Sequence, residues 1–439
     1  MNTSIAVEGT SLDTAVPASP GTLRRVVVSG AIGNFVEWYD LAVYAYAAVI
    51  ISTTFFPTDN PQVGLIATFV MFAVTYAIRP LSGIIMGVLG DRLGRKRLLV
   101  FSILTMAAGT TAIGLLPDYS TIGIAAPILL LACRVVQGIA AGGEFVGAAT
   151  YVYEYAPAER RGFLLGLIQM GTGLCYPAAA FLSFGIASAV GPEAFAGGAW
   201  RVLFLLSAPL ALVALYIRVK LTESPVFKAL EAAQEVSKSP LKDSLQSNPR
   251  RLVSAIAYLL GYFGGAIMLL FFVPTYLTSV VGVDPQHASL LMGFTTLVFA
   301  VFIPVFGLLV DRTSRTASRL VSAGLHAALA IPAFVLIGGG SDAAMYAGLF
   351  LLAVLQSYYY AVGPLTAVDA FPAKIRFTSG TIAYNIPAAA VPAFLPALSA
   401  LLVAQTGLNF APGFVILALS LVGVVGALGL RGTRERSQI

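Results

Sequence analysis

The sequence predicts an all-α membrane protein with twelve transmembrane helices. Of its 439 residues, 58% are hydrophobic and only 10% are charged, and the mean hydropathy is +0.87. A soluble protein of this size carries much more charge. A helix needs roughly 20 apolar residues to cross the bilayer core, and the apolar residues fall into twelve segments of about that length or more. Too little of the chain is left for a soluble domain.

The twelve segments follow one another with short polar stretches between them. They cover residues 24–55, 62–89, 97–116, 122–153, 161–188, 198–219, 251–279, 286–310, 317–338, 343–370, 376–404 and 409–430.

Basic residues occur in every second loop and near both ends of the chain. Lys and Arg lie within 92–97, 160–161, 218–251, 312–319 and 374–376, whereas the alternate loops, such as "FFPTDNPQ" and "GPEAFAGG", contain neither. Loops rich in Lys and Arg stay on the cytoplasmic side, so both chain ends are predicted to be cytoplasmic. The net charge of +6 therefore reflects topology, and we expect no binding to nucleic acid.

Two loop patterns recur, which predicts two similar halves. "GVLGDRLGRKR" (87–97) matches "GLLVDRTSRTA" (307–317), and "EYAPAERR" (154–161) matches "DAFPAKIR" (369–376). We therefore expect two six-helix bundles, 24–219 and 251–430, joined by a cytoplasmic linker at 220–250. A disordered lead at 1–23 and a cytoplasmic tail at 431–439 complete the predicted organisation.

These motifs also carry a family resemblance. "GVLGDRLGRKR" resembles the loop motif of the major facilitator superfamily, and "RVVQGIAAGGE" (134–144) is similar to its fourth-helix motif. Together with "GNFVEWYD" (33–40) and "RPLSG" (79–83), the sequence resembles the metabolite:H⁺ symporter family within that superfamily. The resemblance implies the major facilitator fold and proton-coupled transport. Members of that family carry organic acids such as citrate, or the osmolytes proline and betaine.

Five charged residues lie inside the predicted spans, where each needs a partner or water. With a helical rise of 1.5 Å per residue from the cytoplasmic end, Glu37 and Arg79 lie about 18 Å deep, Glu144 about 15 Å, Asp40 about 22 Å and Arg134 about 30 Å. The first three should share one layer. Asp40 has no obvious cation at its own depth.

The chemistry of these residues suggests separate roles. An arginine keeps its proton inside a protein, whereas a carboxylate can exchange one when its surroundings change. We expect Glu37, Asp40 and Glu144 to couple protons, and Arg79 and Arg134 to bind substrate. A purely structural ion pair between Glu37 and Arg79 is the alternative.

Polar side chains in other spans complete the predicted substrate site, because an amide in a lipid-buried helix needs a partner. They are Gln137, Gln169, Tyr262, Tyr384 and Asn385.

The family resemblance implies a cytoplasmic gate that holds the outward-open state. Carried over to this sequence, its residues are Asp91, Arg92, Arg95 and Glu154 in the first half and Asp311, Arg312, Arg315 and Asp369 in the second. The alternative is that the basic residues only set topology. Acidic residues contribute little to topology, so the recurrence of Asp91 and Asp311 favours the gate.

The sequence predicts a secondary active transporter of a bacterial inner membrane, coupling proton entry to uptake of a mono-, di- or tricarboxylate. Two buried cations favour an anion. A proton-coupled symporter of a zwitterionic osmolyte and a metabolite exporter are the alternatives; the osmosensing family member has a long C-terminal extension, whereas this sequence ends soon after Arg431, which favours the organic acid. A pore would favour rings of like residues, which the two dissimilar halves do not offer.

None of the sequence motifs indicates an enzyme. The sequence lacks G-x-S-x-G, H-E-x-x-H and a P-loop, and its two cysteines and two histidines are isolated. We therefore expect no enzyme activity, no cofactor other than the coupling proton, no metal and no use of ATP. The expected partners are the metabolite, protons and the lipid bilayer, and the chain is expected to work as a monomer.

Overall fold

The computed structural model describes residues 19–431, apart from the side chains at positions 61, 62, 65, 69, 285 and 286. Eleven helices in this part of the chain are long and apolar enough to cross a membrane, and the pair α1 (Pro20–Tyr46) and α2 (Ala48–Phe55), bent by 67°, supplies a twelfth span. No strand occurs in residues 19–431. The prediction of an all-α protein with twelve transmembrane helices is confirmed.

The first helix starts earlier than the apolar pattern suggested. The Ser19 hydroxyl accepts a hydrogen bond from the Thr22 amide at 3.3 Å, and Pro20 occupies the first helical position. Serine before a helix and proline at its first position both favour a helix start. The other predicted lead residues, 1–18, and the tail residues 432–439 lie outside the described part of the chain.

The first half contains six long spans with short helices between them. After α1 and α2 come α3 (Pro61–Leu93), α4 (Arg95–Leu115), α5 (Tyr119–Ile122), α6 (Ala125–Tyr155), η1 (Ala158–Arg160), α7 (Arg161–Val190), α8 (Pro192–Ala194), η2 (Phe195–Ala199), α9 (Arg201–Leu205) and α10 (Ser207–Val219).

The second half follows a linker that forms two helices, α11 (Pro225–Ala232) and α12 (Pro240–Ser247). Its elements are α13 (Pro249–Ile267), η3 (Met268–Phe272), α14 (Val273–Ser279), α15 (Pro285–Asp311), α16 (Arg315–Ile337), α17 (Asp342–Asp369), η4 (Ala373–Ile375), α18 (Arg376–Thr406) and α19 (Pro412–Gly429).

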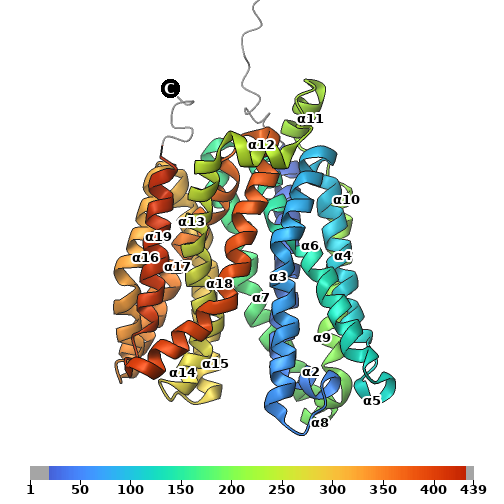
Figure 1. Cartoon of the computed structure of the whole chain (residues 1–439), viewed down its shortest axis with the longest axis vertical. Helices are drawn as coiled ribbons and strands as arrows, with labels where there is room; N and C mark the ends of the chain where they lie inside the picture. The colour runs from blue at the N-terminus through green and yellow to red at the C-terminus, as the bar shows by residue number, and fades with distance from the viewer. Residues whose placement is uncertain (1–18, 432–439) are drawn as a thin grey trace, which may run out of the picture.

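The two halves form two helix bundles that meet along two helix pairs. Helix α3 packs along α18, and α7 packs along α15. Figure 1 shows α11 and α12 at one end of the molecule, which we call the linker end. The ribbons of the two bundles lie closer together there than at the opposite end.

Recurring glycines permit this close contact. A Cβ added to Gly307 would lie 2.6 Å from the Gly162 carbonyl oxygen, and one added to Gly87 would lie 2.7 Å from the Thr378 Cα. Distances this short leave no room for a side chain. Gly87 and Gly307 occupy the same position in the repeated loop pattern, so the repeat preserves the contact between α3 and α18 and its counterpart between α15 and α7.

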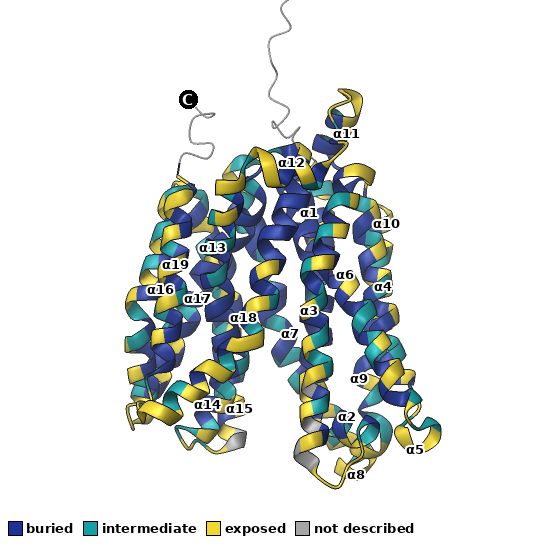
Figure 2. Cartoon of the chain, in the orientation of Figure 1, coloured by how far each residue is buried: buried dark blue, intermediate teal, exposed yellow. Residues whose placement is uncertain are grey.

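The distribution of polarity suits a lipid environment. Large apolar side chains such as Phe181, Phe184 and Phe294 are about 70% exposed on the outer helix faces, whereas charged side chains such as Glu37 and Arg79 are buried. Figure 2 shows the buried residues concentrated toward the inner faces of the helices. Lipid can cover the outer apolar surface, while the inner charges need protein partners.

Candidate functional site

Three buried acid–base pairs lie inside the first bundle. Glu37 and Asp40 on α1 pair with Arg79 on α3 and Arg134 on α6, and Glu144 on α6 pairs with Arg218 at the end of α10. All six side chains are at most 3% exposed. A charge buried in a membrane protein needs this kind of compensation.

The pair of Glu37 and Arg79 is held by one hydrogen bond. Arg79 Nη2 donates to Glu37 Oε1 at 2.8 Å. Within the described part of the chain, Glu37 Oε2 and Arg79 Nε and Nη1 have no hydrogen-bond partner. The pair therefore keeps one acceptor and two donor groups with which it can bind something else.

Asp40, in contrast, is fully engaged. Its Oδ2 lies 3.3 Å from Arg134 Nη1, and its Oδ1 accepts hydrogen bonds from Thr110 at 2.8 Å and Gln137 at 2.6 Å. The expectation that no cation lies at the depth of Asp40 is wrong. The long Arg134 side chain reaches the carboxylate from a different helix, which counting residues along α6 alone does not reveal.

Glu144 belongs to a separate cluster that sequence reasoning missed. Both of its oxygens accept hydrogen bonds from Arg218, and Ser102 donates to one of them. Arg218 also donates to the Leu99 carbonyl oxygen. The sequence offers one indication of this role, since Arg218 falls inside the predicted sixth span although it is one of the basic residues near the linker.

Gly33 makes room for the Glu144 cluster. A Cβ at Gly33 would lie 1.9 Å from Arg218 Nη2 and 2.4 Å from Glu144 Oε1. We expect Gly33→Ala to lower the free energy of unfolding by about 1–3 kcal/mol, because the added methyl overpacks the core. Thermal unfolding of the purified protein in detergent tests this.

Gly185 on α7 provides the matched control. A Cβ there would meet no heavy atom within 4 Å, so Gly185→Ala should not lower the unfolding temperature. Equal unfolding temperatures for both variants would contradict the steric role of Gly33.

The predicted substrate residues of the two bundles meet at the interface between them. Gln169 on α7 donates to the Tyr262 hydroxyl on α13, and Asn385 on α18 donates to the Gly142 carbonyl oxygen at 2.7 Å. Tyr384 stacks on Phe145 with ring centroids 4.5 Å apart. Gln137 is the exception, since it lies in the Asp40 network.

At the linker end, each motif aspartate binds the start of a helix in the other bundle. Asp91 accepts hydrogen bonds from the Thr378 amide at 2.8 Å and the Phe377 amide at 3.4 Å, at the start of α18. Asp311 accepts from the Gly162 amide at 2.6 Å and the Phe163 amide at 2.8 Å, at the start of α7. A carboxylate at a helix N-terminus satisfies free amides and interacts favourably with the helix dipole.

Buried ion pairs reinforce this contact. Glu154 lies 3.4 Å from Arg95 and 3.1 Å from Arg376, which begin helices in different bundles. Within the second bundle, Asp369 pairs with Arg319 and lies 3.9 Å from the partly exposed Arg315.

A family model for the Major Facilitator Superfamily matches residues 30–385. The chain belongs to the major facilitator superfamily. It is therefore a multi-pass membrane transporter, and its relatives are transporters too. The proline/betaine transporter of Salmonella typhimurium is 33% identical over 426 residues, which cover 95% of this chain and 85% of the relative. The glycine betaine/proline/ectoine/pipecolic acid transporter OusA of Dickeya dadantii is 31% identical, with 98% of this chain and 87% of the relative covered.

Solved structures of the superfamily share the fold. The proton:xylose symporter XylE bound to 6-bromo-6-deoxy-D-glucose superposes with a TM-score of 0.76 at 17% identity, covering 94% of this chain and 95% of that chain. A partially occluded inward-open conformation of XylE from E. coli gives a TM-score of 0.66, also at 17% identity, with 93% and 97% covered.

Two of the residues predicted to form the cytoplasmic gate take no part in these contacts at the linker end. Arg92 is exposed and donates to the Lys238 carbonyl oxygen in the linker, and Arg312 is exposed on the surface. Arg319 and Arg376 take part in the ion pairs instead, although sequence reasoning did not select Arg319 and treated Arg376 only as part of the repeat.

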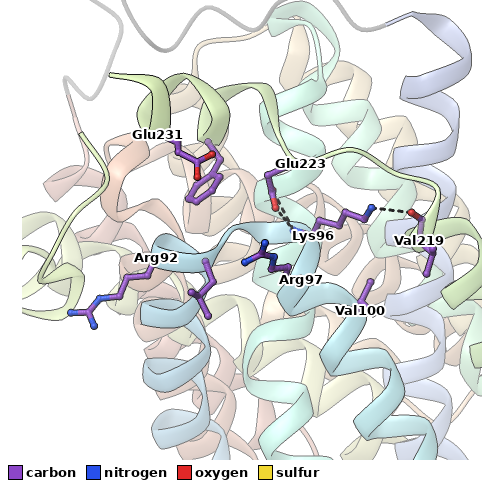
Figure 3. Close-up of a pocket in the computed structure, with 9 residues that line it drawn as sticks. Arg92, Lys96, Arg97, Val100, Val219, Glu223 and Glu231 are labelled. Atoms are coloured by element: carbon purple, nitrogen blue, oxygen red, sulfur yellow. Dashed lines mark hydrogen bonds between the residues drawn. The ribbon is translucent and has the colours of Figure 1, made fainter. Parts of the chain in front are cut away.

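A cavity of about 630 Å³ lies at the linker end. It is lined by residues of α3, α4, α10, the linker and α11, and therefore by one bundle and the linker alone. Figure 3 shows Glu223 facing the start of α4, where it accepts hydrogen bonds from the Arg95 and Lys96 amides, and Lys96 reaching the Val219 carbonyl oxygen at 2.9 Å. These contacts fasten the linker to the first bundle.

Proposed function

We propose that this transporter takes up a small zwitterionic osmolyte of the betaine or proline kind together with protons. The observation that carries the proposal is charge balance at the buried site. The organic-acid expectation rested on Arg79 and Arg134 as cations available to an anion. Each of them faces a carboxylate, and so does Arg218. A neutral substrate with both charges suits such a site better than a multiply charged anion does.

The relatives support this substrate class. Their names describe transport of proline, betaine, ectoine and pipecolic acid, all of which combine a carboxylate with a positively charged nitrogen. Similarity over more than nine tenths of this chain includes the segments that hold the buried charges.

Glu37 is the carboxylate we assign to proton coupling. Asp40 and Glu144 use both carboxylate oxygens in ion pairs and hydrogen bonds, whereas Glu37 keeps Oε2 without a partner among the described residues. A proton on Glu37 would release Arg79 for the substrate carboxylate. The coupling ion is thus the only cofactor in the proposal, and no step uses ATP.

The contacts at the linker end support an alternating-access mechanism. Asp91, Asp311 and Glu154 join the two bundles there, so they would hold that end closed while the opposite end admits substrate. By the distribution of Lys and Arg, the linker end faces the cytoplasm. We place the transporter in a bacterial inner membrane, in keeping with its bacterial relatives.

Uptake into proteoliposomes tests the proposal. Labelled glycine betaine, proline and citrate are offered with an inside-alkaline pH gradient, with a potassium diffusion potential, or with a protonophore. Betaine carried with one proton moves one net positive charge, so we expect saturable uptake driven by either gradient and abolished by the protonophore. Protein-free liposomes of the same lipids provide the background. Accumulation of citrate in place of betaine and proline would overturn the proposed substrate class.

A further inference from the structure

Six buried polar atoms between the two bundles have no hydrogen-bond partner among the described residues. They are Glu37 Oε2, Arg79 Nε and Nη1, and the hydroxyl oxygens of Tyr76, Tyr176 and Tyr360. None of the five residues is more than 8% exposed. Buried polar groups are normally hydrogen-bonded, so a concentration of exceptions in one region points to a ligand that completes them.

Contacts among the five residues place them around one region. The Arg79 guanidinium lies 5.1 Å from the centre of the Tyr76 ring. Phe72 and Phe271, whose ring centroids are 6.2 Å apart, link Tyr76 to Tyr176, and Tyr360 stacks on Tyr262, to whose hydroxyl Gln169 of the first bundle donates. Tyr76 and Tyr176 belong to the first bundle and Tyr360 to the second, so a ligand bound here would contact both halves.

Neighbouring aromatic rings hold the three tyrosines in place. Tyr360 stacks on Tyr262 with centroids 4.2 Å apart and an interplanar angle of 7°. Tyr176 meets Phe271 edge-on at 5.9 Å, and Tyr76 lies 5.4 Å from Phe72. Rings supported in this way offer a fixed set of π faces, edges and hydroxyl oxygens.

The available groups match the two ends of a zwitterion. Arg79 Nε and Nη1 lie on different sides of the guanidinium, and each can donate a charge-assisted hydrogen bond to a carboxylate oxygen. A quaternary ammonium has no N–H to donate, and proteins bind it with aromatic rings and their partial negative charge. The three tyrosines supply such rings, and the Tyr76 ring is the one that the Arg79 guanidinium contacts.

We propose that Arg79 binds the carboxylate of the osmolyte and that Tyr76, Tyr176 and Tyr360 form a collar around its ammonium group, while Glu37 receives the coupling proton at Oε2. This assignment rests on the proposed function and gives it an orientation. Protonation of Glu37 neutralises the carboxylate that balances Arg79, so the substrate carboxylate takes its place. The net charge of the site with substrate and proton bound is then one unit more positive than before.

The collar predicts that loss of a tyrosine hydroxyl affects binding of proline and of glycine betaine differently. Proline carries N–H groups that can donate to the tyrosine hydroxyls, whereas glycine betaine carries only methyl groups. Loss of a hydroxyl should therefore weaken proline binding and spare betaine. Loss of the ring should weaken both.

Uptake by the full-length chain in proteoliposomes tests this orientation with two variants at one position. We expect Tyr360→Phe to raise the KM for proline about tenfold, because a hydrogen bond to a charged group is lost, and to leave the KM for betaine within about twofold. We expect Tyr360→Leu to raise both KM values about tenfold or more. Tyr76 and Tyr176 should give the same pattern.

Tyr359 is the matched control. It is the neighbouring residue and is equally buried, but its hydroxyl donates to the Tyr258 carbonyl oxygen at 3.0 Å inside the second bundle. Tyr359→Phe should change the KM values for proline and betaine equally or not at all. If Tyr360→Phe behaves like Tyr359→Phe while the native chain still accumulates betaine, the collar is wrong and the proposed function stands. If the native chain accumulates neither osmolyte, the proposed function fails first.

Discussion

Replacing Glu37 by Gln is expected to abolish proton-driven accumulation of substrate while sparing exchange of substrate across the membrane. Glutamine has nearly the shape of glutamate but cannot take up a proton. The loaded carrier can still reorient in exchange, since that process needs no net proton movement. We expect the ratio of internal to external betaine under a pH gradient to fall to about 1 in Glu37→Gln, because the gradient supplies no more free energy. Counterflow of labelled betaine against unlabelled betaine should persist.

An exposed carboxylate serves as the control for this variant. Glu193 lies on the surface in α8, so Glu193→Gln should accumulate substrate like the native chain. Full accumulation by Glu37→Gln would remove Glu37 as the proton carrier. Loss of both accumulation and exchange, with an unchanged unfolding temperature, would also contradict the assignment, because it would show that the charge is needed for substrate binding itself.

Replacing Glu154 by Gln is expected to open the linker end. Glu154 lies between Arg95 of the first bundle and Arg376 of the second, and Ser224 of the linker donates to it as well. Removing one partner from a buried ion pair costs about 3–5 kcal/mol. Since this cost falls mainly on the state closed at the linker end, the closed population should fall by about two to four orders of magnitude relative to the open one.

A buried reporter cysteine measures this change. Thr150 lies one turn before Glu154 on α6 and is fully buried. Thr150→Cys, in a chain from which Cys133 and Cys175 are removed, should react with a membrane-impermeant maleimide from the linker end much faster when Glu154→Gln is also present. Glu159→Gln, an exposed neighbour in η1, should leave the labelling rate unchanged. Equal labelling rates in the Glu154→Gln and native backgrounds would show that Glu154 does not hold this end closed.

Several features of the protein could be predicted from the one-dimensional pattern of residues. Twelve apolar segments predict twelve spans, because the bilayer thickness sets the length of a transmembrane helix. The shared depth of Glu37 and Arg79 anticipated that they lie in one layer, because helical rise converts residue number into depth. The repeated loop pattern likewise marked Asp91 and Asp311 as residues with equivalent positions.

Lateral contacts could not be predicted in the same way. Depth along a helix does not determine which helix packs against it. The partners of Asp40 and Glu144 therefore depend on how α1, α4, α6 and α10 pack together. In the sequence Arg218 is one more basic residue near the linker, whereas in the structure it forms an ion pair with Glu144. The proposed tyrosine collar could not be predicted for the same reason, since Tyr76, Tyr176 and Tyr360 come from three helices.

The sequence by itself determined the membrane-spanning architecture, the two-bundle repeat and the presence of carboxylates and arginines within the membrane, since these depend on hydrophobic length and local composition. Only the tertiary structure decided which charges balance one another and which polar atoms remain for a ligand. Those outcomes depend on side-chain reach and on helix neighbours that are far apart in the chain. Because each buried arginine of the site faces a carboxylate, the site suits a zwitterion better than an anion.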